Sequence, residues 1–284
     1  MIKLIATDVD GTLFPDYGQN LTADFFETLK ALMTYGVMFG PSSGRPLSNL
    51  KKVFSPVADD IFYMCQNGAS SFYQNKNLFK VPMANEDIQG IIQDVRTLDG
   101  CACVADTGEM CYLERGNEEG FAFMQNVYHF DCKMVDDLLK LDEPCIKFTV
   151  YRETDVEEIT NQEFTPKWRR KLTVACSGDR VVDLMSKRVS KRTALARIQK
   201  KFGVSPEETL VFGDNINDLE MLNQAKYSVA VGNARNEVKE ACHYITDNCD
   251  HDGELKVLNA LLADFDHPDA ALAPFRKNMI EKCN

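Results

Sequence analysis

Residues 2–13 read Ile2-Lys3-Leu4-Ile5-Ala6-Thr7-Asp8-Val9-Asp10-Gly11-Thr12-Leu13. The run over residues 2–7 is largely apolar and has the length of a strand, which predicts a buried β-strand. Asp8 and Asp10 follow it directly, and in extended backbone their side chains point to the same side. Two crowded carboxylates repel each other unless a cation or a proton relieves them. A plain strand ending in an Asp-Gly turn would show the same pattern, so this stretch alone leaves both interpretations open.

The segments around this stretch alternate between helical and strand-like patterns. Apolar residues recur at helical spacing over residues 21–33, where Thr22 can cap the helix, and over 194–202, where Gly203 can end it. Further strands are expected at 37–39, 61–64, 209–212 and 227–231, and further helices at 219–225 and 257–262. This alternation predicts an α/β fold with a doubly wound, mostly parallel sheet covered by helices on both faces.

The middle of the chain follows a different pattern. An amphipathic helix is expected at 85–98, followed by strands in hairpins at 101–105, 110–113, 145–151, 171–175 and 180–184. The pairs Thr107-Gly108 and Ser177-Gly178 suit short turns between such strands. We therefore predict an inserted α+β domain at residues 84–187, within a core formed by 1–83 and 188–284.

Composition limits the classes of partner. The 284 residues include 43 acidic and 32 basic side chains, a formal net charge of −11, which disfavours binding to nucleic acid or to anionic membranes. No apolar run approaches the ~20 residues of a membrane span. The N-terminal stretch does not resemble a signal peptide, so we expect a cytoplasmic protein. The 10 cysteines are scattered without a C-x-x-C pair, which favours reduced thiols over a zinc site.

Polar residues follow other strands or open helices of the predicted core. The second strand ends in Gly40-Pro41-Ser42-Ser43-Gly44-Arg45-Pro46, where a hydroxyl and a helix N-terminus can bind an anion. Lys191 opens a helix, where a cation opposes the helix dipole unless an anion lies nearby. The acidic loop Gly213-Asp214-Asn215-Ile216-Asn217-Asp218 follows a buried strand. Each could be an ordinary cap, turn or solvated face, but their convergence on one sheet favours a functional site.

The order of these motifs resembles that of the haloacid dehalogenase (HAD) superfamily of phosphatases. D-x-D-G-T at Asp8–Thr12 is followed by Ser43-Gly44-Arg45, then by Lys191, then by G-D-x-x-N-D at Gly213–Asp218. The insertion between the second and third motifs is similar to that of the Cof-type branch, whose members carry a class IIB cap. The stretches at residues 66–69, 231–234 and 252–253 are also Cof-like.

The resemblance implies a role for each motif. Asp8 would be the nucleophile and Asp10 the general acid and base. Asp8, Asp214 and the backbone carbonyl of Asp10 would hold Mg²⁺, and Asp218 would support Lys191 or a metal-bound water. The phosphoryl group would be bound by Val9, Ser43, Gly44, Lys191 and Asn217.

The implied protein is a magnesium-dependent phosphomonoester hydrolase. Its substrates would be small phosphometabolites, by family analogy sugar phosphates, and the cap would close over the core. We expect a monomer or weak dimer that binds neither nucleic acid nor membranes. A phosphomutase, or a phosphometabolite-binding protein without catalysis, remains open as an alternative.

Overall fold

The computed structural model describes residues 1–15 and 20–277. It divides into two compact units, each described separately below. The first comprises Met1–Gly44, Leu50–Lys76 and the chain from Ser190 onward, and the second comprises Arg45–Asn49 and Asn77–Val189. The sequence analysis predicted these boundaries at 83/84 and 187/188. In the structure, the segment 77–83 instead lies in the second unit.

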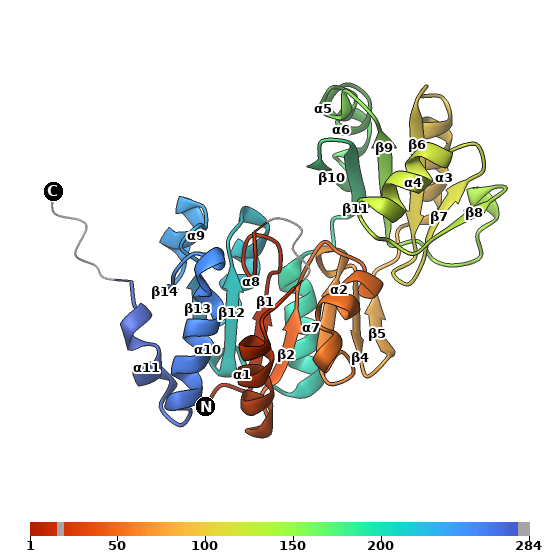
Figure 1. The fold of residues 1–284 in the computed structure, drawn as a ribbon. Coiled ribbons are helices and arrows are strands. Elements are labelled where there is room, and N and C mark those ends of the chain that lie inside the picture. The colour runs from red at the N-terminus through yellow and green to blue at the C-terminus, as the bar shows by residue number, and fades with distance from the viewer. Residues whose placement is uncertain (16–19, 278–284) are drawn as a thin grey trace, which may run out of the picture. The chain divides into compact units, whose positions relative to one another are not determined.

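The first unit is built on a five-stranded parallel sheet with the order β14-β13-β12-β1-β2 (Figure 1). Its strands are β1 (Leu4–Thr7), β2 (Met38–Pro41), β12 (Thr209–Gly213), β13 (Tyr227–Ala230) and β14 (Tyr244–Ile245). The central strand β1 pairs with β2 on one side, Leu4 opposite Met38, and with β12 on the other, Leu4 opposite Thr209. The strand order reverses between β1 and β12, and in such sheets ligands bind beyond the carboxyl ends of the strands at that point.

Helices cover both faces of this sheet, as expected for a doubly wound α/β fold (Figure 1). They are α1 (Ala23–Thr34), α2 (Leu47–Val53, across the division between the units), α7 (Lys191–Phe202), α8 (Leu219–Leu222), α9 (Asn236–Ala241), α10 (Gly253–Ala263) and α11 (Pro268–Ala271). Helix α1 packs on α10, and α7 packs on α8. Two predicted helix ends are confirmed: Thr22 accepts a hydrogen bond from the Phe25 N–H, and Gly203 ends α7 with φ of 67°.

The strand expected at 61–64 has a different role from the predicted one. It forms β3 (Phe62–Cys65), which is linked to the parallel sheet by a bridge between Ser42 and Met64. It belongs to a second, three-stranded sheet with β4 (Ser70–Tyr73) and β5 (Lys76–Lys80), two strands that the sequence analysis missed. The chain reverses because Gln66, Asn67 and Gly68 all have positive φ, of 45°, 54° and 97°.

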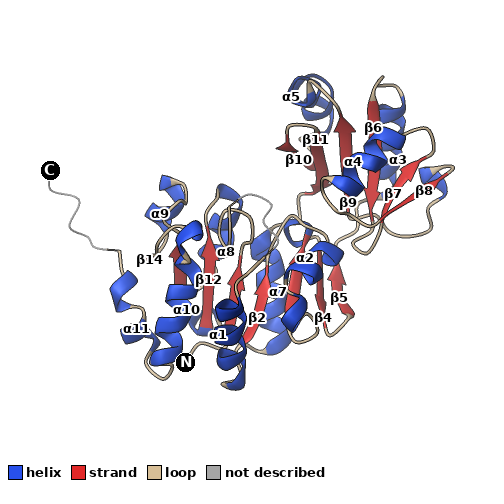
Figure 2. Cartoon of the chain, in the orientation of Figure 1, coloured by secondary structure: helices blue, strands red, loops and turns tan. Residues whose placement is uncertain are grey.

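The second unit is an α+β structure around a six-stranded sheet with the order β10-β11-β9-β6-β7-β8 (Figure 2). Its strands are β6 (Cys101–Asp106), β7 (Cys111–Glu114), β8 (Cys132–Val135), β9 (Lys147–Arg152), β10 (Leu172–Gly178) and β11 (Val181–Ser186), and its helices are α3 (Asn85–Arg96), α4 (Glu118–Asn126), α5 (Val156–Ile159) and α6 (Thr165–Trp168). Apolar residues of α3, α5 and α6 pack on one face and Met124 of α4 on the other, so both faces of the sheet are covered.

One predicted hairpin turn is confirmed and another is wrong by two residues. The Thr107 N–H donates to the Met110 carbonyl at 3.0 Å, which closes the expected turn between β6 and β7. The turn expected at 177–178 lies instead at 179–180, because β10 continues through an irregularity in its pairing with β11.

A buried ion pair crosses the sheet of the second unit. Lys147 Nζ lies 3.4 Å from Asp183 Oδ2, and the two side chains are 4% and 7% exposed. The Thr149 hydroxyl donates to the other oxygen, Asp183 Oδ1, at 2.5 Å. Burial acts to lower the pKa of Lys147, but Asp183 and Asp106 outweigh it and raise that pKa above its usual value. The ammonium is therefore held in its charged form inside the sheet.

The sequence analysis favoured reduced thiols and found no apolar run long enough to span a membrane. The nine cysteines among the described residues carry reduced thiols, and Cys283 lies outside the described residues. Across the part of the chain that the structure describes, no helix is both long and apolar enough to cross a membrane.

Candidate active site

A buried lysine joins two carboxylates at the carboxyl edge of the parallel sheet. Asp8 follows β1, and its side chain is 9% exposed. Lys191 is the first residue of α7, and its Nζ lies 2.5 Å from Asp8 Oδ1 and 2.6 Å from Asp218 Oδ1. The cation at this helix start is thus compensated by two anions, as the sequence pattern suggested.

The residues around Lys191 fix its position. Ser190 caps α7, because its hydroxyl accepts the Thr193 N–H at 3.2 Å and the Thr193 hydroxyl accepts the Ser190 N–H at 3.1 Å. The second oxygen of Asp218 accepts the N–H groups of Asp214 and Asn215 at 3.1 and 3.0 Å. Asp218 therefore holds the ammonium and the acidic loop together, which agrees with the supporting role expected for it.

The turn after β1 brings Asp214 close to Asp8. Gly11 has φ of +84°, and a Cβ added to it would lie 2.6 Å from Asp214 Oδ2. The Thr12 hydroxyl donates to Asp214 Oδ1 at 2.8 Å. The Gly11 carbonyl accepts the Asn233 side-chain amide at 2.7 Å, and Asn233 Oδ1 in turn accepts the Cys249 N–H at 2.8 Å. Only a residue without a side chain fits at position 11 against this carboxylate.

The electrostatics of this group favour a bound cation. Burial, together with Asp218, raises the pKa of Asp8 well above its usual value, although Lys191 acts in the opposite direction. Burial also raises the pKa of Asp214, against the hydrogen bond from Thr12. In both carboxyl groups burial disfavours the anionic form more than Lys191 and Thr12 favour it, and a bound cation would act against that burial cost.

Three carboxylates lie close enough to share a metal ion. One oxygen from each of Asp8, Asp214 and Asp218 lies within 4.8 Å of the others. Both oxygens of Asp218 already accept hydrogen bonds, one from Lys191 and the other from two backbone N–H groups. Asp8 and Asp214 are therefore the better candidates for metal ligands. A donor set of carboxylate oxygens fits a hard divalent cation.

Asp10 is not a member of that group of three carboxylates. Its backbone forms an isolated bridge with Phe14, and its side chain is partly exposed. The described cluster does not include the Asp10 carboxylate. Its expected role in proton transfer and the expected metal contact of its backbone carbonyl both stay predictions.

Three of the residues expected to bind phosphate, Ser43, Gly44 and Asn217, lie beside Asn67. The Asn67 N–H donates to the Ser43 carbonyl at 2.9 Å. A Cβ on Gly44 would lie 3.4 Å from Asn67 Nδ2, and Asn217 Nδ2 lies 3.5 Å from Asn67 Oδ1. Ser43 is buried, Gly44 half-buried and Asn217 exposed. The side chain of Val9 is fully buried, so only its backbone is placed to meet a ligand.

Sequence reasoning missed four residues that organise this site, namely Thr7, Asn67, Asn233 and Glu254. Asn67 and Asn233 stand in stretches noted only as family-like, where their spacing to the other motifs could have identified them. Glu254 gave no such signal, because an acidic residue in the first turn of a helix is ordinary. The structure shows it buried, with its Oε2 2.6 Å from the Thr7 hydroxyl.

Comparison with known proteins identifies the family of the chain. Residues 5–258 match the family model of haloacid dehalogenase-like hydrolases. The chain is 26% identical over 269 residues to 5-amino-6-(5-phospho-D-ribitylamino)uracil phosphatase YbjI of Escherichia coli, covering 92% of this chain and 96% of that one.

Solved structures of similar proteins also point to this family. A protein of Eubacterium rectale of known crystal structure is 35% identical, with a TM-score of 0.85 over 92% of this chain and 99% of that one. The HAD subclass IIB sugar phosphatase BT4131 is 25% identical, with a TM-score of 0.73 over 90% and 98% of the two chains. The chain belongs to the haloacid dehalogenase-like hydrolase family, in its Cof-type branch, and is an enzyme of the phosphatase class.

Proposed function

We propose that this phosphatase is a Mg²⁺-dependent phosphomonoester hydrolase that acts on small phosphorylated metabolites, with sugar phosphates as the first class to test. The observation that carries the proposal is the contact of Lys191 with both Asp8 and Asp218 beside Asp214. A carboxylate held by a buried ammonium, next to a second carboxylate whose anionic form burial disfavours, suits a site where a cation assists the attack of an anion on a phosphate ester.

The proposed reaction has two steps. An Asp8 carboxylate oxygen attacks phosphorus, the P–O bond to the substrate alcohol breaks, and Asp10 gives its proton to the departing alkoxide. Water then attacks the aspartyl phosphate, Asp10 takes a proton from that water, and inorganic phosphate leaves with Asp8 restored. One residue thus serves as acid in the first step and as base in the second.

The remaining residues bind the phosphoryl group. Lys191, Asn217, the Ser43 hydroxyl and the backbone of Val9 and Gly44 would hold its oxygens through the transition state. Asp8, Asp214 and the Asp10 carbonyl would hold Mg²⁺, which supplies positive charge against the repulsion between carboxylate and phosphate. Asp218 positions Lys191 through the contact at 2.6 Å.

The proposed substrate class is based on the names of two similar proteins. YbjI is named for a phosphorylated ribitylamino compound, and BT4131 for sugar phosphates. Both names describe a phosphate ester of a polyhydroxylated carbon chain. We therefore expect the protein to prefer phosphorylated sugars and sugar alcohols over aryl phosphates.

The test is phosphate release from a panel of phosphomonoesters, with and without Mg²⁺. The panel contains sugar phosphates, a ribityl phosphate, nucleotides, pyridoxal phosphate and a chromogenic aryl phosphate. Release that requires Mg²⁺ and is lost in Asp8→Asn and Asp10→Asn supports the proposal. Release that survives Asp8→Asn overturns the mechanism. Isomerisation without free phosphate would indicate a phosphomutase, and binding without either reaction a sensor.

A further inference from the structure

Glu254 is a buried acid near the proposed nucleophile, Asp8, and the proposed reaction gives it no role. Glu254 is the second residue of α10, and it is 3% exposed. Its Oε2 lies 2.6 Å from the hydroxyl oxygen of Thr7, the last residue of β1. That hydroxyl also lies 2.7 Å from the backbone carbonyl oxygen of Asp8. A continuous polar chain therefore runs from Glu254 to the backbone of the nucleophile.

Counting protons along this chain assigns the state of Glu254. A threonine hydroxyl carries one proton, and a backbone carbonyl can only accept. If Glu254 were ionised, both neighbours of the Thr7 hydroxyl would be acceptors, and only one of the two short contacts would be a hydrogen bond. If Glu254 is the neutral acid, its O–H donates to Thr7 and the Thr7 hydroxyl donates to the Asp8 carbonyl. Only the neutral acid satisfies both contacts.

The surroundings of Glu254 also favour the neutral acid. Its other oxygen, Oε1, is buried without a hydrogen-bond partner in the part of the chain that the structure describes. Burial raises the pKa of Glu254 well above its usual value, and the charge of Asp8 adds to this, while the Thr7 hydroxyl acts against it. A buried carboxylate without a cation is far more costly than a buried neutral acid.

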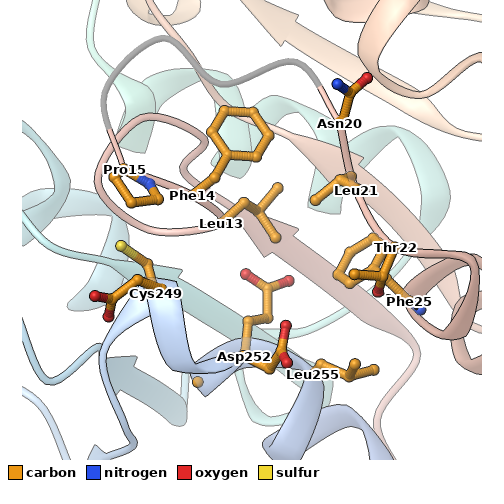
Figure 3. A pocket seen from close by; sticks show the side chains of 13 residues that line it. Leu13, Phe14, Pro15, Asn20, Leu21, Thr22, Phe25, Cys249, Asp252 and Leu255 are labelled. Atoms are coloured by element: carbon orange, nitrogen blue, oxygen red, sulfur yellow. Dashed lines mark hydrogen bonds between the residues drawn. The ribbon is translucent and has the colours of Figure 1, made fainter.

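A small cavity lies beside Glu254, within the first unit. It has a volume of about 190 Å³, and Glu254 lines it together with Leu13, Phe14, Leu21 and Phe25 (Figure 3). Asp252 lies on the same wall, so the charged groups that face this region are acidic (Figure 3). The lining also contains the polar residues Asn20 and Thr22 and a second acid, Asp250. The negative charges of Asp250 and Asp252 favour the protonated form of Glu254.

We propose that Glu254 is a positioning residue that stays protonated, donates to Thr7 and, through the Thr7 hydroxyl, fixes the backbone carbonyl of Asp8. The catalytic consequence rests on the function proposed above. Asp8 must present its carboxylate to phosphorus along one direction, and a displacement of about 1 Å can cost ~100-fold in rate. The chain through Thr7 restrains the backbone of Asp8, while Lys191 contacts its carboxylate.

The protonation state is tested without any substrate. Infrared difference spectra between the wild-type protein and Glu254→Gln at neutral pH isolate the signal of this one side chain. We expect the variant to lose the carbonyl band of a protonated carboxylic acid, and Thr7→Val to shift that band. Loss of ionised-carboxylate bands instead would overturn the proposal. Because the readout does not involve turnover, it stands even if the proposed hydrolase activity fails.

The positioning role is tested by the kinetics of conservative and disruptive variants. Glu254→Leu and Thr7→Val should each lower kcat by about 10-fold with little change in KM, a fraction of the ~100-fold cost of full misplacement. Glu254→Gln and Thr7→Ser, which keep a donor, should restore most of that loss. The double variant Glu254→Leu/Thr7→Val should be no slower than the slower single variant, because both break one chain.

A matched control separates positioning from stability. Val257 is fully buried in the same helix and lies outside the chain of hydrogen bonds. Val257→Ala should lower the thermal stability without changing kcat at temperatures where the protein is folded. If Glu254→Leu behaves like Val257→Ala, or if the effects of Glu254→Leu and Thr7→Val multiply as independent losses, the positioning role is refuted.

Discussion

Lys191 Nζ lies 2.5 Å from Asp8 Oδ1, although the two residues are 183 positions apart in the sequence. One residue follows the first strand of the sheet and the other opens a helix that begins after the whole second unit. Their contact accounts for a cation at a helix N-terminus, where the helix dipole disfavours it. The two carboxylates raise the pKa of Lys191 above its usual value, even though its burial acts to lower it.

Replacing this lysine should abolish activity. Lys191→Met leaves Asp8 and Asp218 buried without their shared cation, so we expect kcat to fall by about 100- to 1000-fold, the range for losing one stabilising donor. Lys187 is exposed and lies four residues earlier, and Lys187→Met serves as the control that should keep full activity. Equal losses in the two variants would contradict the assignment of Lys191.

The close approach of Gly11 to Asp214 predicts a specific effect on metal dependence. Gly11→Ala places a Cβ 2.6 Å from Asp214 Oδ2, at a backbone φ of +84°. Asp214 must then move, so we expect a higher Mg²⁺ concentration for half-maximal activity and a smaller Mg²⁺-induced rise in Tm.

Gly36 offers a matched control for that substitution. Its φ is +83°, and a Cβ at that position would meet nothing within 4 Å. Gly36→Ala should therefore show the same backbone cost, about 1 kcal/mol, with an unchanged response to Mg²⁺. A shift in metal dependence in both variants would show that the effect is one of stability alone.

Local patterns predicted the parallel sheet and the place of the site. Apolar runs marked β1 and β12, and the polar residues after them had to meet, because parallel strands carry their carboxyl ends to one edge. The motif order identified Asp8, Asp214 and Lys191, which the structure brings together.

The features that the sequence analysis missed depend on tertiary packing. β4 and β5 follow a reversal in which Gln66 and Asn67 take positive φ, a choice that few non-glycine residues make and that composition does not reveal. Glu254 stands in the first turn of its helix, where an exposed acid is common, but in the folded protein it is buried against Thr7 of β1. No local pattern predicts which member of a helix's first turn faces the sheet edge.

The buried pair in the second unit should be costly to break. Lys147→Met leaves Asp183 and Asp106 without the ammonium, so we expect a loss of about 3–5 kcal/mol in the free energy of unfolding. Lys147→Met combined with Asp183→Asn removes the uncompensated charge and keeps an acceptor for Thr149, so it should recover part of that loss. Urea unfolding of the four proteins of this cycle measures the coupling. Additive losses would show that the two side chains do not interact.

The proton held by Glu254 should appear in the pH dependence of stability. The pKa of Glu254 in the folded state lies well above its usual value of 4.5. Between pH ~4.5 and that folded-state pKa, the folded protein keeps a proton that the unfolded chain releases. The contribution of this group to stability is therefore full below pH ~4.5 and is lost as the pH rises toward the folded pKa. Glu254→Gln cannot titrate, and it should gain stability relative to the wild-type protein by about 1.4 kcal/mol per pH unit in that window.

Urea unfolding of both proteins from pH 5 to pH 8, with a chelator present, measures this slope because other titrating groups cancel in the difference. A difference between wild type and Glu254→Gln that stays constant with pH would mean that Glu254 is already ionised in the folded state. In that case the Thr7 hydroxyl would donate to Glu254 and leave the Asp8 carbonyl without its hydrogen bond.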